Sequence, residues 1–149
     1  MTLEDWKDVH LVDPTIATNN YQKHFIDSIN EDLMYGLDLV ELNGLHLEFG
    51  VFSGHSINFC SAHKPNQIFH GFDSFEGLPE DWDLVGNVDN QMSSIKVKNK
   101  GHFALDQLPD VNENVALHKG FFDRSLAPWM SENIHKDSKI AWLHLDADL

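Results

Sequence analysis

Two carboxylates close to the end of the sequence, Asp146 and Asp148, are the residues whose types and spacing most directly suggest chemistry. They come at the end of an apolar run, 138–146, which predicts a strand buried on both faces. Residues two apart on an extended chain point the same way, so His144 shares their side of the strand. Such a pair of acids supplies half of a Mg²⁺ site, or divides metal binding and general base catalysis between its members. A solvated pair of surface acids is the alternative.

A second chemical pattern is the glycine-flanked turn Gly50-Val51-Phe52-Ser53-Gly54, which follows Glu48. Glycines let a backbone approach a ligand, and the first amides of a following helix attract an anion. Phe52 stands where the dinucleotide fingerprint has its second glycine, and the Gly-Lys-Ser/Thr of a P-loop is absent. The pattern therefore suits a ligand with a carboxylate and no phosphate at this place, or else it is an ordinary strand-to-helix turn.

The third candidate is Asp73, which ends an apolar run about 20 residues beyond the glycine turn. A carboxylate at this point of an α/β domain can accept hydrogen bonds from both hydroxyls of a ribose. It can equally cap a turn or a helix.

Strands that alternate with helices would position these residues. The spacing of apolar residues predicts a helix over 21–34, capped by Thr18 or Asn19 and ended by Gly36. The elements expected after it are strand 45–49, helix 57–62, strand 67–72, a surface loop or lid over 74–100, a weak helix over 102–108, strand 114–118, helix 123–133 with Asp123 as its cap, and strand 138–146. This order predicts an α/β domain with a doubly wound, mostly parallel sheet, in which ligands bind at the carboxyl ends of the strands.

Composition narrows the classes of function. A chain of 149 residues has room for one domain, and 10 Lys and Arg against 24 Asp and Glu argue against nucleic-acid binding and an anionic membrane surface. A single cysteine, Cys60, excludes an internal disulfide, and the acidic N-terminus lacks the pattern of a signal peptide. No apolar run is long enough for a membrane helix. We therefore expect a cytoplasmic protein that acts on a small molecule; a homo-oligomer stays open.

Four blocks of sequence together resemble the macrocin O-methyltransferase family, which are class I, S-adenosylmethionine-dependent enzymes that methylate sugar hydroxyls. The blocks run over 48–57, 71–82, 114–123 and 143–149, and the most specific is Gly71-Phe-Asp-Ser-Phe-Glu-Gly-Leu-Pro79. The resemblance covers about residues 44–149, which divides the chain into an N-terminal helical segment, 1–43, and a partial S-adenosylmethionine-binding domain, 44–149.

The resemblance implies a role for each motif residue. Residues expected at the cofactor are Glu48, Gly50, Val51, Phe52, Ser53, Gly54 and Ser56 on the methionine side, and Asp73 and Ser74 at the ribose. Asp146 would ligate Mg²⁺, and Asp148 would be the base that takes the proton of the acceptor hydroxyl. The implied activity is methyl transfer from S-adenosylmethionine to a hydroxyl of a sugar or a similar small molecule, assisted by Mg²⁺.

Members of that family continue past the two acids into a further strand with more acidic metal ligands. We therefore expect this sequence to hold only the N-terminal four strands of a Rossmann-like methyltransferase domain, truncated after Asp146-Ala-Asp148. The alternative function is a catalytically inactive nucleotide-binding or interaction fragment. An NAD-dependent oxidoreductase is disfavoured by Phe52 and the missing Gly-x-Gly.

Overall fold

A computed structural model describes the backbone of residues 19–88 and 91–147, and the side chains of 27–82 and 98–147. Along the chain its elements are α1 (Asn19–Asp38), β1 (Leu45–Phe49), α2 (His55–His63), β2 (Phe69–Asp73), β3 (Trp82–Val88), β4 (Gln91–Lys98), β5 (Val115–Lys119), α3 (Phe122–Asn133) and β6 (Ile140–Leu145). None of the described helices is both long and apolar enough to cross a membrane.

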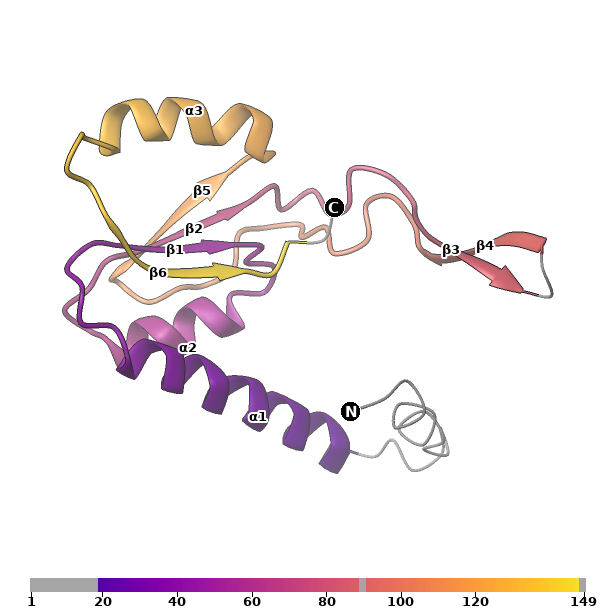
Figure 1. The fold of residues 1–149 in the computed structure, drawn as a ribbon, viewed down its shortest axis with the longest axis horizontal. Helices are drawn as coiled ribbons and strands as arrows, with labels where there is room; N and C mark the ends of the chain where they lie inside the picture. The colour runs from indigo at the N-terminus through magenta and orange to yellow at the C-terminus, as the bar shows by residue number, and fades with distance from the viewer. Residues whose placement is uncertain (1–18, 89–90, 148–149) are drawn as a thin grey trace.

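Four of the strands form one parallel sheet in the order β5-β2-β1-β6. The chain moves outward from β1 to β2 and β5, and then returns to the other side of β1 to form β6. Helices α1 and α2 lie on one face of the sheet, here called the α2 face, and α3 lies on the other, the α3 face (Figure 1). The predicted α/β class with a parallel sheet is confirmed.

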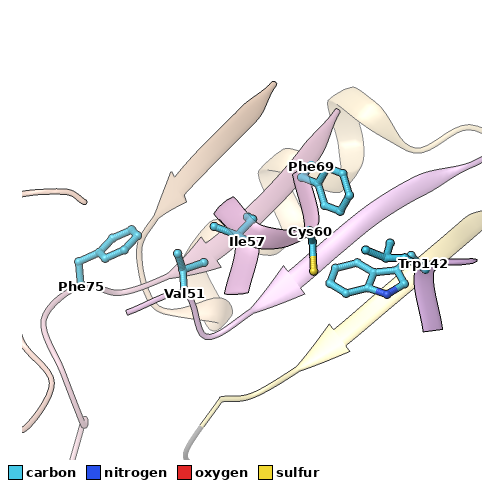
Figure 2. Packing of buried hydrophobic residues seen from close by; sticks show 7 residues of the cluster. Val51, Ile57, Cys60, Phe69, Phe75 and Trp142 are labelled. Carbon is cyan, nitrogen blue, oxygen red and sulfur yellow. The ribbon is translucent and has the colours of Figure 1, made fainter. Parts of the chain in front are cut away.

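The α2 face carries the larger of the two cores. Phe69 of β2 and Ile57 and Cys60 of α2 are fully buried, and Trp142 of β6 packs edge-on against Phe69 with ring centroids 5.6 Å apart (Figure 2). Leu37, near the end of α1, is also fully buried in this cluster. Burial of these side chains fixes α1 and α2 against β1, β2 and β6, because apolar area removed from water is the main favourable term in folding.

The α3 face has a smaller core, formed by the buried residues Leu47, Phe72 and Trp129. Strand β6 does not share in it. Leu143 is 47% exposed and Leu145 is 69% exposed, and they stand beside Leu47 and Phe49 in the register of the sheet. The prediction that 138–146 is buried on both faces is therefore wrong. Within the described residues β6 is an edge strand, and side chains of α3 pack on β1 and β2 instead.

The segment 74–100, predicted as a loop or lid, contains the antiparallel hairpin β3-β4, which projects away from the parallel sheet (Figure 1). Its strands pair with each other and with no strand of the parallel sheet. Hydrophobic periodicity reports a buried face, and a hairpin held by its own backbone hydrogen bonds does not require one. The hairpin was therefore missed.

The predicted weak helix over 102–108 is also absent, and turns stand in its place. The Leu78 amide donates to the His102 carbonyl, the Gly101 amide to Leu78, and the Leu105 amide to Phe75, so this segment is hydrogen-bonded to 75–78. Phe103 has a φ of 71°, which no helix accommodates. Tertiary pairing has overridden a weak local preference.

Two predicted helix ends are wrong. Helix α1 continues through Gly36 to Asp38, because the fully buried Leu37 holds the last turn against the core. Asp123 is not the cap of α3: the N-cap is Phe121, and Asp123 lies in the first turn, where its charge favours the positive end of the helix. Helix α1 is described from Asn19; Thr18, the other predicted cap, lies outside the described residues.

Candidate functional site

A cavity of about 520 Å³ opens at the carboxyl ends of β1, β2 and β6. It lies where the chain order reverses, because β1 has β2 on one side and β6 on the other. In open α/β sheets this reversal point separates the connecting loops and leaves a crevice in which ligands bind. The volume is within the range of small-molecule and cofactor pockets.

The glycine turn after β1 forms the floor of this cavity. Gly50 and Gly54 have φ values of 88° and 81°, in the left-handed region that favours glycine. A Cβ on Gly50 would lie 2.4 Å from the backbone oxygen of Asp146, so only glycine lets the β1 turn touch the end of β6. Phe52 also has a positive φ, 46°, and its half-exposed ring lines the cavity. Unusual backbone geometry is thus concentrated at the cavity.

The Asp73 carboxylate ties two of the strand ends together. Its Oδ2 accepts hydrogen bonds from the amides of Val51 and Phe52, both at 2.8 Å, and its Oδ1 accepts one from the Phe75 amide at 2.7 Å. The predicted turn-capping role is therefore seen. An ionised carboxylate has about four acceptor positions, so Asp73 keeps room for about one more donor, such as one hydroxyl of a sugar.

Glu48 is fully buried and does not line the cavity. Its carboxylate accepts a hydrogen bond from Ser56 Oγ at 2.8 Å and lies 3.2 Å from His144 Nδ1. The pKa of His144 is raised above its usual value, chiefly by the hydrogen bond to Glu48, while partial burial acts in the opposite direction. Glu48 thus connects the start of α2 to the end of β6 underneath the site.

The His144–Glu48 contact was not anticipated from the sequence. The two residues are paired across β1 and β6, so the contact becomes visible once the strand order is known. His144 and Ser56 reach the cavity lining, and Glu48 supports both from below.

The cavity brings together most of the residues that the sequence singled out. Those in its lining are Gly50, Val51, Phe52, Ser53, Ser56, Asp73, Ser74 and Asp146. Glu48 and Gly54 are not in the lining, although Gly54 begins α2 by accepting the Asn58 amide. The Ser74 hydroxyl is engaged in a local turn, accepting the Glu76 amide at 3.1 Å. Asp148 lies outside the described residues.

Several lining residues were missed from the sequence, and most are apolar. The apolar ones are Ile29, Leu78, Pro79, Phe103, Phe121, Phe122 and Ala147, and the others are His55 and Gly77. Phe103 contacts Phe52 edge-to-face, with ring centroids 5.3 Å apart. A signal existed for Phe121 and Phe122, which directly follow the third predicted strand, where the same reasoning about strand ends applies.

Charge in the lining is acidic. Asp73 and Asp146 contribute carboxylates, and none of the described lining residues is lysine or arginine. For a metal, Asp146 is exposed at the cavity, but the described residues contain no group of three or more His, Cys, Asp or Glu side chains that could hold an ion. The described residues therefore do not fit a complete Mg²⁺ site.

Comparison with known proteins gave no match, whether against protein-family models, curated proteins or solved structures.

Proposed function

We propose that this protein binds S-adenosylmethionine at the carboxyl edge of its parallel sheet and transfers the methyl group to a hydroxyl of a small molecule. The observation that carries the proposal is the position of the cavity at the point where the chain order reverses, with a left-handed glycine turn on one strand and a carboxylate at the end of the next. The parallel sheet with helices on both faces is compatible with a Rossmann-like methyltransferase domain.

The strand order predicts how the methyl donor, S-adenosylmethionine, would be oriented in the cavity. Its methionine part would lie over the glycine turn of β1, and one ribose hydroxyl would use the remaining acceptor position of Asp73 on β2. Because β5 lies on the far side of β2, the adenine would extend toward the apolar residues Leu78 and Phe121. The reacting methyl group would then face β6, where Asp146 lines the cavity.

Electrostatics favours this donor over a dinucleotide. A sulfonium is a cation, and the described lining holds the carboxylates of Asp73 and Asp146 without a lysine or arginine. A pyrophosphate would face these acids with no lysine or arginine of the described lining to neutralise it, and one cationic candidate of the lining, His144, is already bonded to Glu48. Phe52 further occupies the position at which a second glycine would let a pyrophosphate approach the backbone.

In the proposed reaction the hydroxyl oxygen of the acceptor attacks the methyl carbon in line with the carbon–sulfur bond. That bond breaks, its electron pair stays on sulfur, and the products are the methyl ether, neutral S-adenosylhomocysteine and one proton. The protein contributes chiefly by holding donor and acceptor in line. The resemblance assigns the proton to Asp148 and a Mg²⁺ ion to Asp146, although the described residues do not complete a metal site.

Isothermal titration calorimetry with S-adenosylhomocysteine, and separately with NAD⁺, tests donor binding. We expect binding of the first and none of the second; the reverse result would refute the proposal. A transfer assay then tests turnover and its dependence on metal. It measures transfer of the label from methyl-labelled S-adenosylmethionine to a panel of sugars and other hydroxyl compounds, with Mg²⁺ or with EDTA.

A protein that binds the donor or a related nucleotide without turning it over is a second candidate. The observation that favours it is the exposure of Leu143 and Leu145 on the edge strand β6, which suits contact with another protein chain more than catalysis. Binding of S-adenosylhomocysteine without transfer to any acceptor would select this candidate.

A further inference from the structure

Two histidines form a stacked pair beneath α3. His70 of β2 and His118 of β5 have Nδ1 and Nε2, respectively, 3.1 Å apart, and their rings lie 5.3 Å apart at an interplanar angle of 24°. The sheet register places both on the α3 face, where His118 is the neighbour of Phe72. A contact between two ring nitrogens at this distance is a hydrogen bond in which one nitrogen donates and the other accepts.

Apolar and aromatic groups cover part of the pair, and both imidazoles are half-buried. The buried indole of Trp129 on α3 packs against His70 at 5.1 Å and against His118 at 5.6 Å, and Phe72 stacks on His118 at 4.6 Å. On β1 the register neighbour of His70 is Leu47. Trp129 also contacts Phe72, so the imidazoles are part of the surface on which α3 rests.

No charged side chain of the described elements packed here faces the pair. By strand alternation the titratable residues of β1, β2 and β5 lie on the opposite face, and those of α3 are exposed to solvent. These residues are His46 and Glu48 on β1, Asp73 on β2, Lys119 on β5, and Asp123, Arg124 and Glu132 on α3. A positive charge on the pair would therefore have no acid beside it.

Protonation affects the pair in two steps. One added proton leaves an N–H group facing a neutral nitrogen, so the hydrogen bond survives, but the added charge is half-buried and has no acid beside it. A second proton gives two donors and two like charges at the same contact, and the hydrogen bond is lost. Burial lowers the pKa of both histidines, and the charge of His70 lowers the pKa of His118 further.

Helix α3 connects this pair to the cavity. Phe122 is its first residue and Phe121 its N-cap, and both line the cavity. Phe122 contacts Phe49 of β1 edge-on at 5.5 Å and belongs to the same packed cluster as Trp129. A shift of α3 away from the sheet would therefore displace one wall of the cavity.

We propose that the His70–His118 pair is an acid-sensitive latch that holds α3 on the sheet and, through α3, keeps the Phe121–Phe122 wall of the cavity in place. The effect on ligand binding rests on the proposed function; the effect on α3 does not. The direction follows from linkage: groups whose folded pKa is lowered bind more protons when released, so the latch is complete above the ordinary histidine pKa and is lost as the pH falls through the folded values.

Hydrogen–deuterium exchange of the intact chain at about pH 7.5 and about pH 5 tests the latch, with rates corrected for the intrinsic effect of pH. We expect the protection of 122–133, relative to that of α2, to fall several-fold at the lower pH, because the two histidines bind more protons when they are released. The double variant His70→Phe/His118→Phe keeps the ring stack without titrating and should remove this fall. His118→Gln, which retains a hydrogen-bonding group, is the substitute if the double variant does not fold.

His135→Gln is the matched control, because His135 is exposed just beyond α3 and lies outside the pair. It should behave like the wild type. Equal protection of 122–133 at both pH values, or an acid effect that persists when the pair is replaced, would overturn the proposal.

Titration with S-adenosylhomocysteine at the same two pH values separates this proposal from the proposed function. Affinity that falls at about pH 5 in the wild type but not in the double variant supports both. Absence of binding at either pH refutes the proposed function, and the latch is then decided by the exchange data. Binding that does not change while α3 loosens would overturn the link between α3 and the cavity.

Discussion

On the α2 face of the sheet, Phe69, Ile57 and Cys60 are fully buried, and the carboxylate of Glu48 has two side-chain partners. On the α3 face, Leu143 and Leu145 remain open to solvent beside a helix that rests on an imidazole pair. The strand ends that form the cavity are thus held from the α2 side, by packing and by satisfied buried hydrogen bonds. On the α3 side, the Phe121–Phe122 wall of the cavity is held by α3, and we propose that the attachment of α3 to the sheet depends on pH.

The largest difference between the faces should come from removing one apolar side chain from each. Phe69→Ala should lower the free energy of unfolding by about 3–5 kcal/mol, because a fully buried ring leaves a cavity that the core cannot refill. Leu143→Ala should cost less than about 1 kcal/mol, because the side chain is already half in water. Urea denaturation measures both, and equal losses would contradict the comparison.

Removal of the buried carboxylate should have the next largest effect. Glu48→Ala should cost about 2–3 kcal/mol of unfolding free energy, because the fully buried carboxylate is the hydrogen-bond partner of both Ser56 and His144. Glu48→Gln keeps the shape and one acceptor, and should cost less. A loss as small as that of a surface substitution would show that the buried network does not hold the strand ends.

The same network should give a pH dependence opposite to that of the histidine pair. The pKa of His144 is raised in the folded protein, chiefly by its hydrogen bond to Glu48, so the resulting stability is complete below the ordinary histidine pKa and is lost as the pH rises through the folded value. The difference in unfolding free energy between wild type and Glu48→Gln should therefore be larger at about pH 6 than at about pH 9. Denaturation at the two pH values measures this difference. A difference that does not change with pH would show that His144 and Glu48 do not form an ion pair.

Asp73 tests the cavity itself. Asp73→Ala should weaken binding of S-adenosylhomocysteine by about 1–3 kcal/mol, because it removes a charged acceptor and releases the amides of Val51 and Phe52. Asp106→Ala removes an exposed acid outside the cavity and serves as the control. If calorimetry shows unchanged affinity for S-adenosylhomocysteine, Asp73 does not bind the donor and only caps the turn.

The smallest effect is expected at the start of α3. Phe121→Ser should raise stability by up to about 1 kcal/mol, because serine can accept a hydrogen bond from the amide of Asp123 and the present N-cap makes no side-chain bond. The same change removes an aromatic ring from the cavity wall, so donor affinity should fall while the melting temperature rises. If the melting temperature fell together with the donor affinity, the ring would be needed for folding, and the lower affinity would not show that the ring contacts the ligand.

The elements predicted from the sequence agree with the structure where the prediction rests on residues close together in the chain. The alternation of Leu45, Leu47 and Phe49 predicted β1 within the same bounds, and the apolar spacing predicted α2 and β5 to within a few residues. The convergence of the glycine turn, Asp73 and Asp146 on one cavity also followed, because parallel strands place their carboxyl ends at one edge. The hairpin β3-β4 and the turns of 102–108 did not follow, since both are set by pairing between segments.

The sequence by itself determined the alternation of strand and helix, the acidic character of the chain and the residue types available at each strand end. Those properties depend on side-chain period and on charge, which are read along the chain. The tertiary structure decided that Glu48 lies beneath the site, within hydrogen-bond distance of His144. It also decided that the Asp73 carboxylate accepts three hydrogen bonds from backbone amides, and that two histidines meet under Trp129. Each of these depends on which strands are neighbours and in what register, a choice made by the packing of the whole sheet.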